Sequence, residues 1–165
     1  MRTVEKNILE IKSFDDAVRI VKDQAGEDYP LVKQYEDVIK HGIVLDPRTE
    51  AYMKLIIIAA AYNNLWTPDV MDDAGSYWVP MYVVKGDMDA VELGLDEEEI
   101  INPEVTYIAS NGMEYFFGFS SRSDFDCQEG GYDADDCPVF GLRTKQACDA
   151  AAELFSDIYI KYLFG

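Results

Sequence analysis

The sequence predicts an α+β fold: N-terminal helices, an antiparallel β-sheet, and a C-terminal helix packed on the sheet. Apolar residues recur at helical spacing before Pro68 and again after Thr144. Between these parts, runs of alternating polarity flank an Asn111-Gly112 pair, which is typical of a hairpin within a meander. The length of 165 residues and a hydrophobic content of 48% indicate one globular domain. We divide it into a helical part (about 13–66), a sheet part (about 76–143) and a C-terminal helix (about 144–163).

The first elements are short. Residues 7–12 are predicted to form a strand or an extended lead-in. Ser13 is placed to cap a helix with an apolar face, which ends at Gly26. A second helix is predicted from Pro30 to Gly42.

The next helix is expected at the centre of the fold. Asp46 and Pro47 are typical of a helix start. Over residues 52–61 the only charge is Lys54, so the helix should be buried on most of its circumference. Asn63-Asn64 and Pro68 should end it, and the other elements should pack against it.

The predicted sheet begins after Pro68. Pro80 cannot donate a hydrogen bond to a neighbouring strand, so its strand should lie at an edge or contain a bulge. Asn111-Gly112 predicts a two-residue type I′ turn. The strands are predicted at 77–85, 104–110, 113–119 and 139–143. Thr144 then caps the C-terminal helix, which has one apolar stripe.

Two segments resemble an uncharacterised family of small proteins from Bacteroidales phages and prophage-like elements. One is the central helix running into Asn63-Asn64-Leu65-Trp66-Thr67-Pro68-Asp69, followed by Tyr77-Trp78-Val79-Pro80. The other is Phe140-Gly141-Leu142-Arg143-Thr144-Lys145 with Ala147, Ala151, Phe155, Tyr159 and Leu163. The family pattern is a helix ending in Gly-Trp-x-Pro-Asp, an aromatic strand and a closing strand–helix unit. Leu65 stands where the family usually has Gly. The resemblance implies a phage-related origin. It does not imply any particular activity.

The charge is concentrated in the middle of the chain. Residues 69–136 hold 18 of the 32 acidic residues but only Lys85 and Arg122 of the 14 basic ones, so they carry most of the net charge of −18. The electrostatic field of so many carboxylates repels nucleic acid and attracts basic proteins. We therefore expect a protein partner with a basic surface and no direct binding to nucleic acid. Homo-oligomer formation is left open as an alternative. With no apolar run long enough for a signal peptide or a membrane span, we expect a cytoplasmic protein of the bacterial host.

An aromatic group is the first candidate partner surface. It comprises Trp66, Tyr77, Trp78 and Tyr82, together with Asp69. Aromatic faces beside a carboxylate suit a sugar ring or a peptide side chain. Packing in the core or at a sheet edge is the more common role of such residues.

An acidic loop is a weak candidate for binding Ca²⁺ or Mg²⁺, and no other cofactor is expected. Its carboxylates belong to Asp124, Asp126, Asp133, Asp135 and Asp136. The EF-hand pattern fails because Gly130 is one place late and no Glu closes the loop. A solvated charged loop is the alternative interpretation.

No catalytic motif supports an enzyme. Cys148 lies near the start of the last helix with His41 as the sole imidazole, but a buried packing thiol is the more common case. Cys127 and Cys137 could bridge the acidic loop in an oxidising compartment. We expect a non-enzymatic accessory protein that binds another protein, in the extreme as a nucleic-acid mimic. A carboxylate- or metal-dependent hydrolase and a small virion or assembly component are the alternatives.

Overall fold

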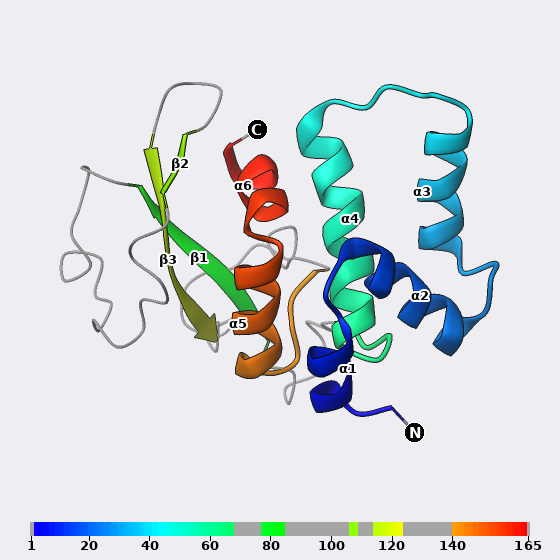
Figure 1. Ribbon diagram of the computed structural model, residues 1–165, viewed down its shortest axis with the longest axis horizontal. Helices are drawn as coiled ribbons and strands as arrows, with labels where there is room; N and C mark the ends of the chain where they lie inside the picture. Colours follow the sequence, from blue (N-terminus) through cyan, green and yellow to red (C-terminus); the bar gives the residue numbers. More distant parts are fainter. Residues whose placement is uncertain (1, 68–76, 85–105, 109–113, 124–139, 165) are drawn as a thin grey trace, which may run out of the picture.

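The computed structural model describes residues 2–67, 77–84, 106–108, 114–123 and 140–164 (Figure 1). Along these segments, a run of helices is followed by strands and then by two further helices. In chain order they are α1 (Val4–Glu10), α2 (Phe14–Ala25), α3 (Pro30–Lys40), α4 (Pro47–Tyr62), β1 (Trp78–Val84), β2 (Thr106–Ile108), β3 (Glu114–Ser123), α5 (Lys145–Leu154) and α6 (Ser156–Phe164).

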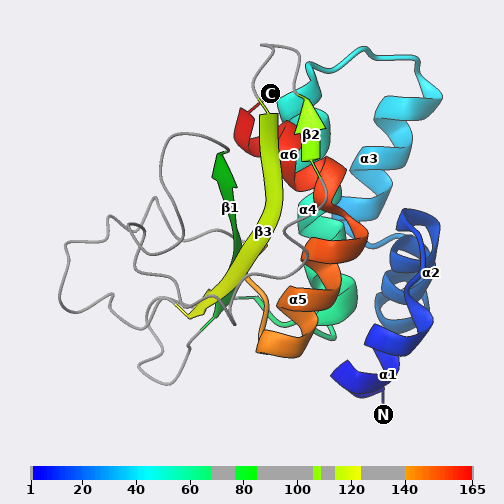
Figure 2. The ribbon, with the colours of Figure 1, turned by 60° about the vertical axis from the view of Figure 1, so that its left-hand side comes forward.

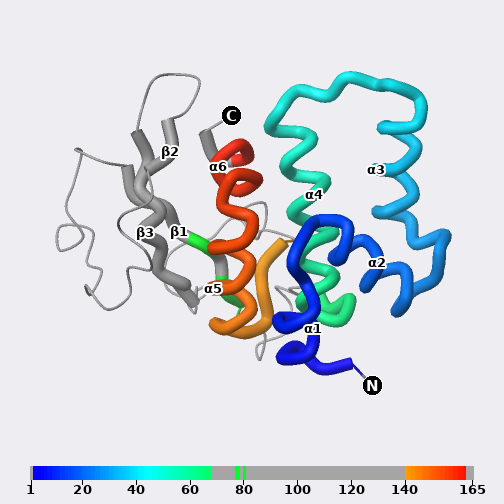
Figure 3. The backbone as a smooth tube through the Cα atoms, in the orientation of Figure 1, coloured from blue at the N-terminus to red at the C-terminus, as the bar shows by residue number. Residues whose placement is uncertain are grey.

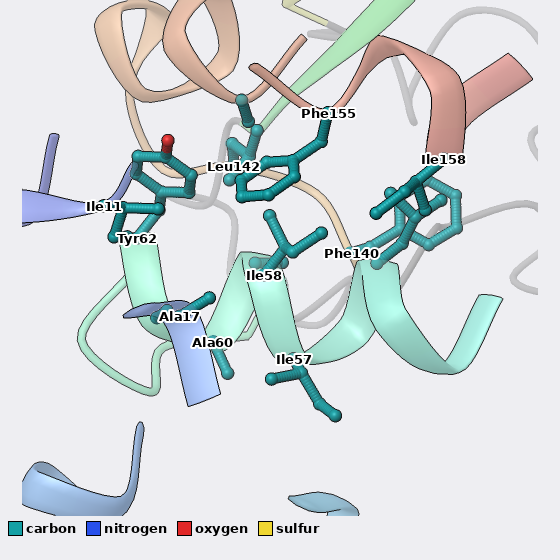
Figure 4. Packing of buried hydrophobic residues seen from close by; sticks show 14 of the residues in the cluster. Ile11, Ala17, Ile57, Ile58, Ala60, Tyr62, Phe140, Leu142, Phe155 and Ile158 are labelled. Carbon is teal, nitrogen blue, oxygen red and sulfur yellow. The ribbon is translucent and has the colours of Figure 1, made fainter. Parts of the chain in front are cut away.

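Helix α4 is the centre of the fold, as the sequence predicts. It contacts α1, α2, α3 and α6 (Figure 1). Leu55, Ile57 and Ile58 are completely buried, and each such side chain contributes about 1.5–3 kcal/mol to folding. Figure 4 shows Ile58 directed toward Phe155 and Leu142, while Ile57 and Ala60 point to other sides of the helix. The helix is therefore covered on several sides, which accounts for its nearly uncharged sequence.

Two helices start at the capping residues that the sequence predicts. Ser13 accepts a hydrogen bond from the backbone N–H of Asp16 at the start of α2. Asp46 accepts one from the N–H of Thr49 at the start of α4. The bond from the Thr49 hydroxyl, together with this backbone bond, lowers the pKa of the Asp46 carboxyl. The predicted ends at Gly26 and Asn63 are the observed C-caps of α2 and α4.

The lead-in predicted as a strand is helical. Residues 4–10 form α1, capped by Thr3, and only Ile11 takes an extended conformation after it. Its one buried side chain, Asn7, donates a hydrogen bond of 2.8 Å to the carbonyl of Ala61 in α4. A helix of seven residues is marginal alone, so this tertiary contact decides its conformation.

The sheet has three antiparallel strands in the order β1-β3-β2. Strand β1, which contains Pro80, is at an edge, and its register shifts between Tyr82 and Val83. Strands β2 and β3 pair with Ile108 opposite Glu114. The predicted turn at Asn111-Gly112, between these two strands, lies outside the described residues.

The predicted α+β organisation is wrong. A meander requires each strand to pair with the next along the chain, but β1 pairs with β3. The core of the described residues is helical: apart from Tyr77, its buried side chains come from the helices, their caps and residues 140–142. Two views show the sheet beside this helical body, next to α5 and away from α2 and α3 (Figures 1 and 2). Of the last predicted strand, 139–143, the described residues 140–143 contain only an isolated bridge between Leu142 and Trp78.

The single C-terminal helix predicted from Thr144 is two helices. Thr144 does cap α5, but that helix ends at Leu154 and α6 starts at Ser156. Between them, Phe155 leaves helical geometry and is 4% exposed. Ser156 and Asp157 favour the first turn of a new helix, which explains the position of the break.

Candidate functional site

A short segment before α5 joins the parts of the molecule that carry the predicted aromatic group. Figure 3 shows this segment, residues 140–144, running into α5. Trp78 and Leu142 exchange backbone hydrogen bonds of 2.7 and 2.8 Å, which tie the segment to the start of β1. On the other side, Asn63 at the end of α4 donates to the Gly141 carbonyl and accepts from the Arg143 N–H, both at 2.8 Å.

These bonds place Arg143 beside Trp66. The guanidinium carbon lies 5.7 Å from the centre of the Trp66 ring, within the range of a cation–π contact. Arg143 is exposed and Trp66 is half-buried, so both are accessible to a partner. Local sequence patterns do not indicate this role of Arg143, because tertiary bonds made by Asn63 hold its segment near the tryptophan.

The other members of the predicted aromatic surface differ in exposure. Tyr77 is 3% exposed, so its ring belongs to the interior. Trp78 is half-buried and packs against the hydrophobic core. Tyr82 lies in β1 opposite Phe119, where the backbone alone is described. Asp69 is outside the described residues. Of the predicted residues whose side chains are described, Trp66 and Trp78 are thus partly accessible, and Arg143 is the charged neighbour of Trp66.

The weak metal candidates lie outside the described part of the chain: Asp124, Asp126, Asp133, Asp135 and Asp136. Cys127 and Cys137 lie there too. Within the described ranges, no cluster of three or more His, Cys, Asp or Glu side chains is arranged to hold a metal ion.

Cys148 has the environment of a packing residue. It is completely buried, and burial raises the pKa of its thiol well above the ordinary value, with the Asp149 charge adding to the effect. His41 is exposed at the end of α3, where its Nδ1 lies 2.7 Å from the Asp37 carbonyl. The thiol is therefore protonated at neutral pH and inert as a nucleophile.

The helical body neutralises much of its own charge. Lys22 illustrates this: its ammonium lies 2.7 Å from Glu36 and 3.1 Å from Glu27, and these bonds raise its pKa. Among the described residues, cations that form ion pairs with acids of the helices or their connections include Arg2, Lys6, Arg19, Lys22, Lys33, Lys54 and Lys145.

Comparison with known proteins adds no assignment. No protein-family model matches the chain, and no curated protein or solved structure shows significant similarity to it. Among the described helices, none combines the length and the apolar character needed to cross a bilayer.

Proposed function

We propose that the protein is a non-enzymatic, phage-related accessory protein that binds a basic protein partner through its acidic middle segment, residues 69–136. In its strongest form, the segment imitates the charge of nucleic acid and occupies a groove built for phosphates. The partner is then a DNA- or RNA-binding protein whose lysines and arginines meet these carboxylates.

The separation of charge supports this proposal most directly. The acidic segment has only Lys85 and Arg122 as internal cations. The helical body could have supplied the missing counter-charges, but many of its cations are engaged in ion pairs with the acids of the body itself. The carboxylates of residues 69–136 thus keep a large excess of negative charge for a partner.

Competition with DNA tests the proposal. A short fluorescent duplex is bound to a basic nucleoid protein, and its anisotropy is followed as this protein is added. We expect displacement of the duplex, with an apparent affinity that falls at least about tenfold between roughly 50 and 200 mM salt, because binding rests on charge. Changing Asp96-Glu97-Glu98-Glu99 to their amides should weaken displacement by about tenfold as well.

The matched control removes the same number of acids from the helical body. Asp15, Asp37, Glu153 and Asp157 have exposed side chains that form no ion pair among the described residues. Their four amides should leave displacement nearly unchanged. Equal effects of the two variants, or displacement that ignores salt, would contradict the proposal. Light scattering on the same samples tests the alternative function of a virion or assembly component. Such a protein would self-associate without a basic partner.

A further inference from the structure

A cavity opens on the helical body where the α1–α2 junction meets the start of α4 and the α5–α6 break. Its volume is about 510 Å³, which is in the range of small-molecule sites. The floor contains Ala51, Phe155 and Ile158, which belong to the hydrophobic core, and Phe14 and Leu154 add further apolar surface. The cavity therefore offers an apolar surface to a ligand at the edge of the core.

Three lysines from three separate elements line the cavity. They are Lys12 at the α1–α2 junction, Lys54 in α4 and Lys161 in α6. Two acids, Glu50 and Asp157, also line it, so the lining carries one net positive charge. A positive cavity is unexpected in a chain with a net charge of −18, since most of its surface repels anions.

The three lysines have different roles. The ammonium of Lys54 lies 2.6 Å from a carboxylate oxygen of Glu50 and 5.7 Å from the centre of the Phe14 ring. Both residues line the cavity, so these contacts hold Lys54 against its lining. Its burial opposes the charge, but the bond to Glu50 and the nearby Tyr35 outweigh this, and its pKa is raised. Lys12 and Lys161 are exposed and form no ion pair with the described residues, which leaves their ammonium groups to a ligand.

We propose that this cavity binds an anionic amphiphile: a carboxylate or similar head group on an aliphatic or aromatic body. The head group pairs with Lys12 and Lys161, and the body covers Phe14 and Leu154 above the nearly buried Phe155 and Ile158. A polar anion such as free phosphate would leave the apolar floor in contact with water, and a neutral apolar molecule would not use the lysines.

The neighbouring surface fits a ligand with an extended body. A second cavity of about 380 Å³ between α1 and α5 shares Lys12 and Leu154 with the first. Its lining includes the partly buried Ile8, the almost fully buried Ile11 and Tyr62, and one acid, Glu153. The apolar surface therefore continues past Lys12 toward α1. This site lies on described helices and is opposite in sign to the acidic segment, so the inference does not depend on the proposed function.

Binding of an anionic fluorescent amphiphile, 8-anilinonaphthalene-1-sulfonate, tests the site. We expect one saturable site per chain and competitive displacement by decanoate. The double variant Lys12→Gln/Lys161→Gln should bind the dye at least about fivefold more weakly, because two charge-assisted contacts are lost. Binding of the neutral dye N-phenyl-1-naphthylamine should be unchanged. A double variant on α3, Lys33→Gln/Lys40→Gln, removes the same charge outside this cavity and should bind the anionic dye like the parent protein.

A second pair of variants tests the location. Leu154 lines both cavities and is 39% exposed, so Leu154→Trp should fill the entrance and reduce dye binding without disturbing the core. Leu9→Trp changes a 72% exposed leucine outside the cavity and serves as the control. The inference is overturned if the lysine variant or Leu154→Trp binds the anionic dye like its control, or if decanoate fails to displace the dye.

Discussion

Asn63 shows how one side chain fixes the relation between distant segments. Its amide nitrogen donates to the Gly141 carbonyl and its oxygen accepts from the Arg143 N–H, with the residue only 1% exposed. The neighbouring Asn64 has φ of 54°, and its amide oxygen accepts bonds from Asn7 and Gln24. The asparagine pair thus ends α4 and also holds α1, α2 and the segment before α5 in place.

Replacing Asn63 with Ala should reduce the free energy of unfolding by about 2–4 kcal/mol. The change removes both hydrogen bonds and leaves the buried Gly141 carbonyl and the partly buried Arg143 N–H without their partner. A buried group left unpaired in this way costs about 1–3 kcal/mol. Urea denaturation followed by far-UV circular dichroism measures the loss.

An exposed amide provides the comparison. Gln146→Ala in α5 should change the stability by less than about 0.5 kcal/mol, since surface substitutions are usually near neutral. A loss below about 1 kcal/mol for Asn63→Ala would show that water replaces the lost bonds, and the position of Arg143 beside Trp66 would then need another cause.

At the scale of an element, the end of α3 shows which local features are readable. Gly42 has φ of 63°, and the bonds from Gly42 N–H to Ile39 and from Ile43 N–H to Val38 form a Schellman motif. A glycine after an apolar helical face predicts this end. Helix α1 lacks such a signal, because its seven residues are too few to separate a helical from an alternating pattern.

Gly42→Ala should destabilise the protein by about 1 kcal/mol, because an L-residue resists the left-handed conformation. A β-carbon at this position would meet no atom within 4 Å, so the cost is conformational rather than steric. Gly42→Asn should cost less, since Asn tolerates this region. Thermal denaturation of the parent protein and the two variants measures the order of their stabilities. An alanine variant as stable as the parent would contradict the assigned backbone strain.

At the scale of the whole molecule, the sequence predicts what is local or strongly patterned. The central position of α4 follows from its apolar composition, and the β2–β3 pairing follows from proximity in the chain. The β1–β3 pairing, the α5–α6 break and the contact of Arg143 with Trp66 depend on distant segments, so local patterns do not encode them. Of the predicted partner surface, the structure keeps Trp66 and Trp78 accessible and buries Tyr77.

The uneven charge of the molecule predicts its response to salt. With 32 acidic and 14 basic residues, the folded chain repels itself, and added salt screens this repulsion as the Debye length falls from about 30 Å at 0.01 M to about 10 Å at 0.1 M. The ion pairs of the helical body weaken under the same conditions, but exposed pairs contribute at most about 1 kcal/mol each. Repulsion should therefore dominate, and the midpoint of thermal unfolding should rise with sodium chloride by roughly 2–4 °C per kcal/mol gained.

The two sets of amide variants separate these effects. Neutralising Asp96-Glu97-Glu98-Glu99 should raise the midpoint at low salt and flatten its dependence on salt, because the repulsion is then partly removed in advance. Neutralising Asp15, Asp37, Glu153 and Asp157 should not raise the midpoint, because these acids lie in the nearly neutral helical body and two of them, Asp15 and Asp157, favour the first turns of α2 and α6. A midpoint that falls as sodium chloride is added would mean that the helical ion pairs outweigh the repulsion. The acidic segment would then be balanced within the folded molecule, and it would have little excess charge for a basic partner.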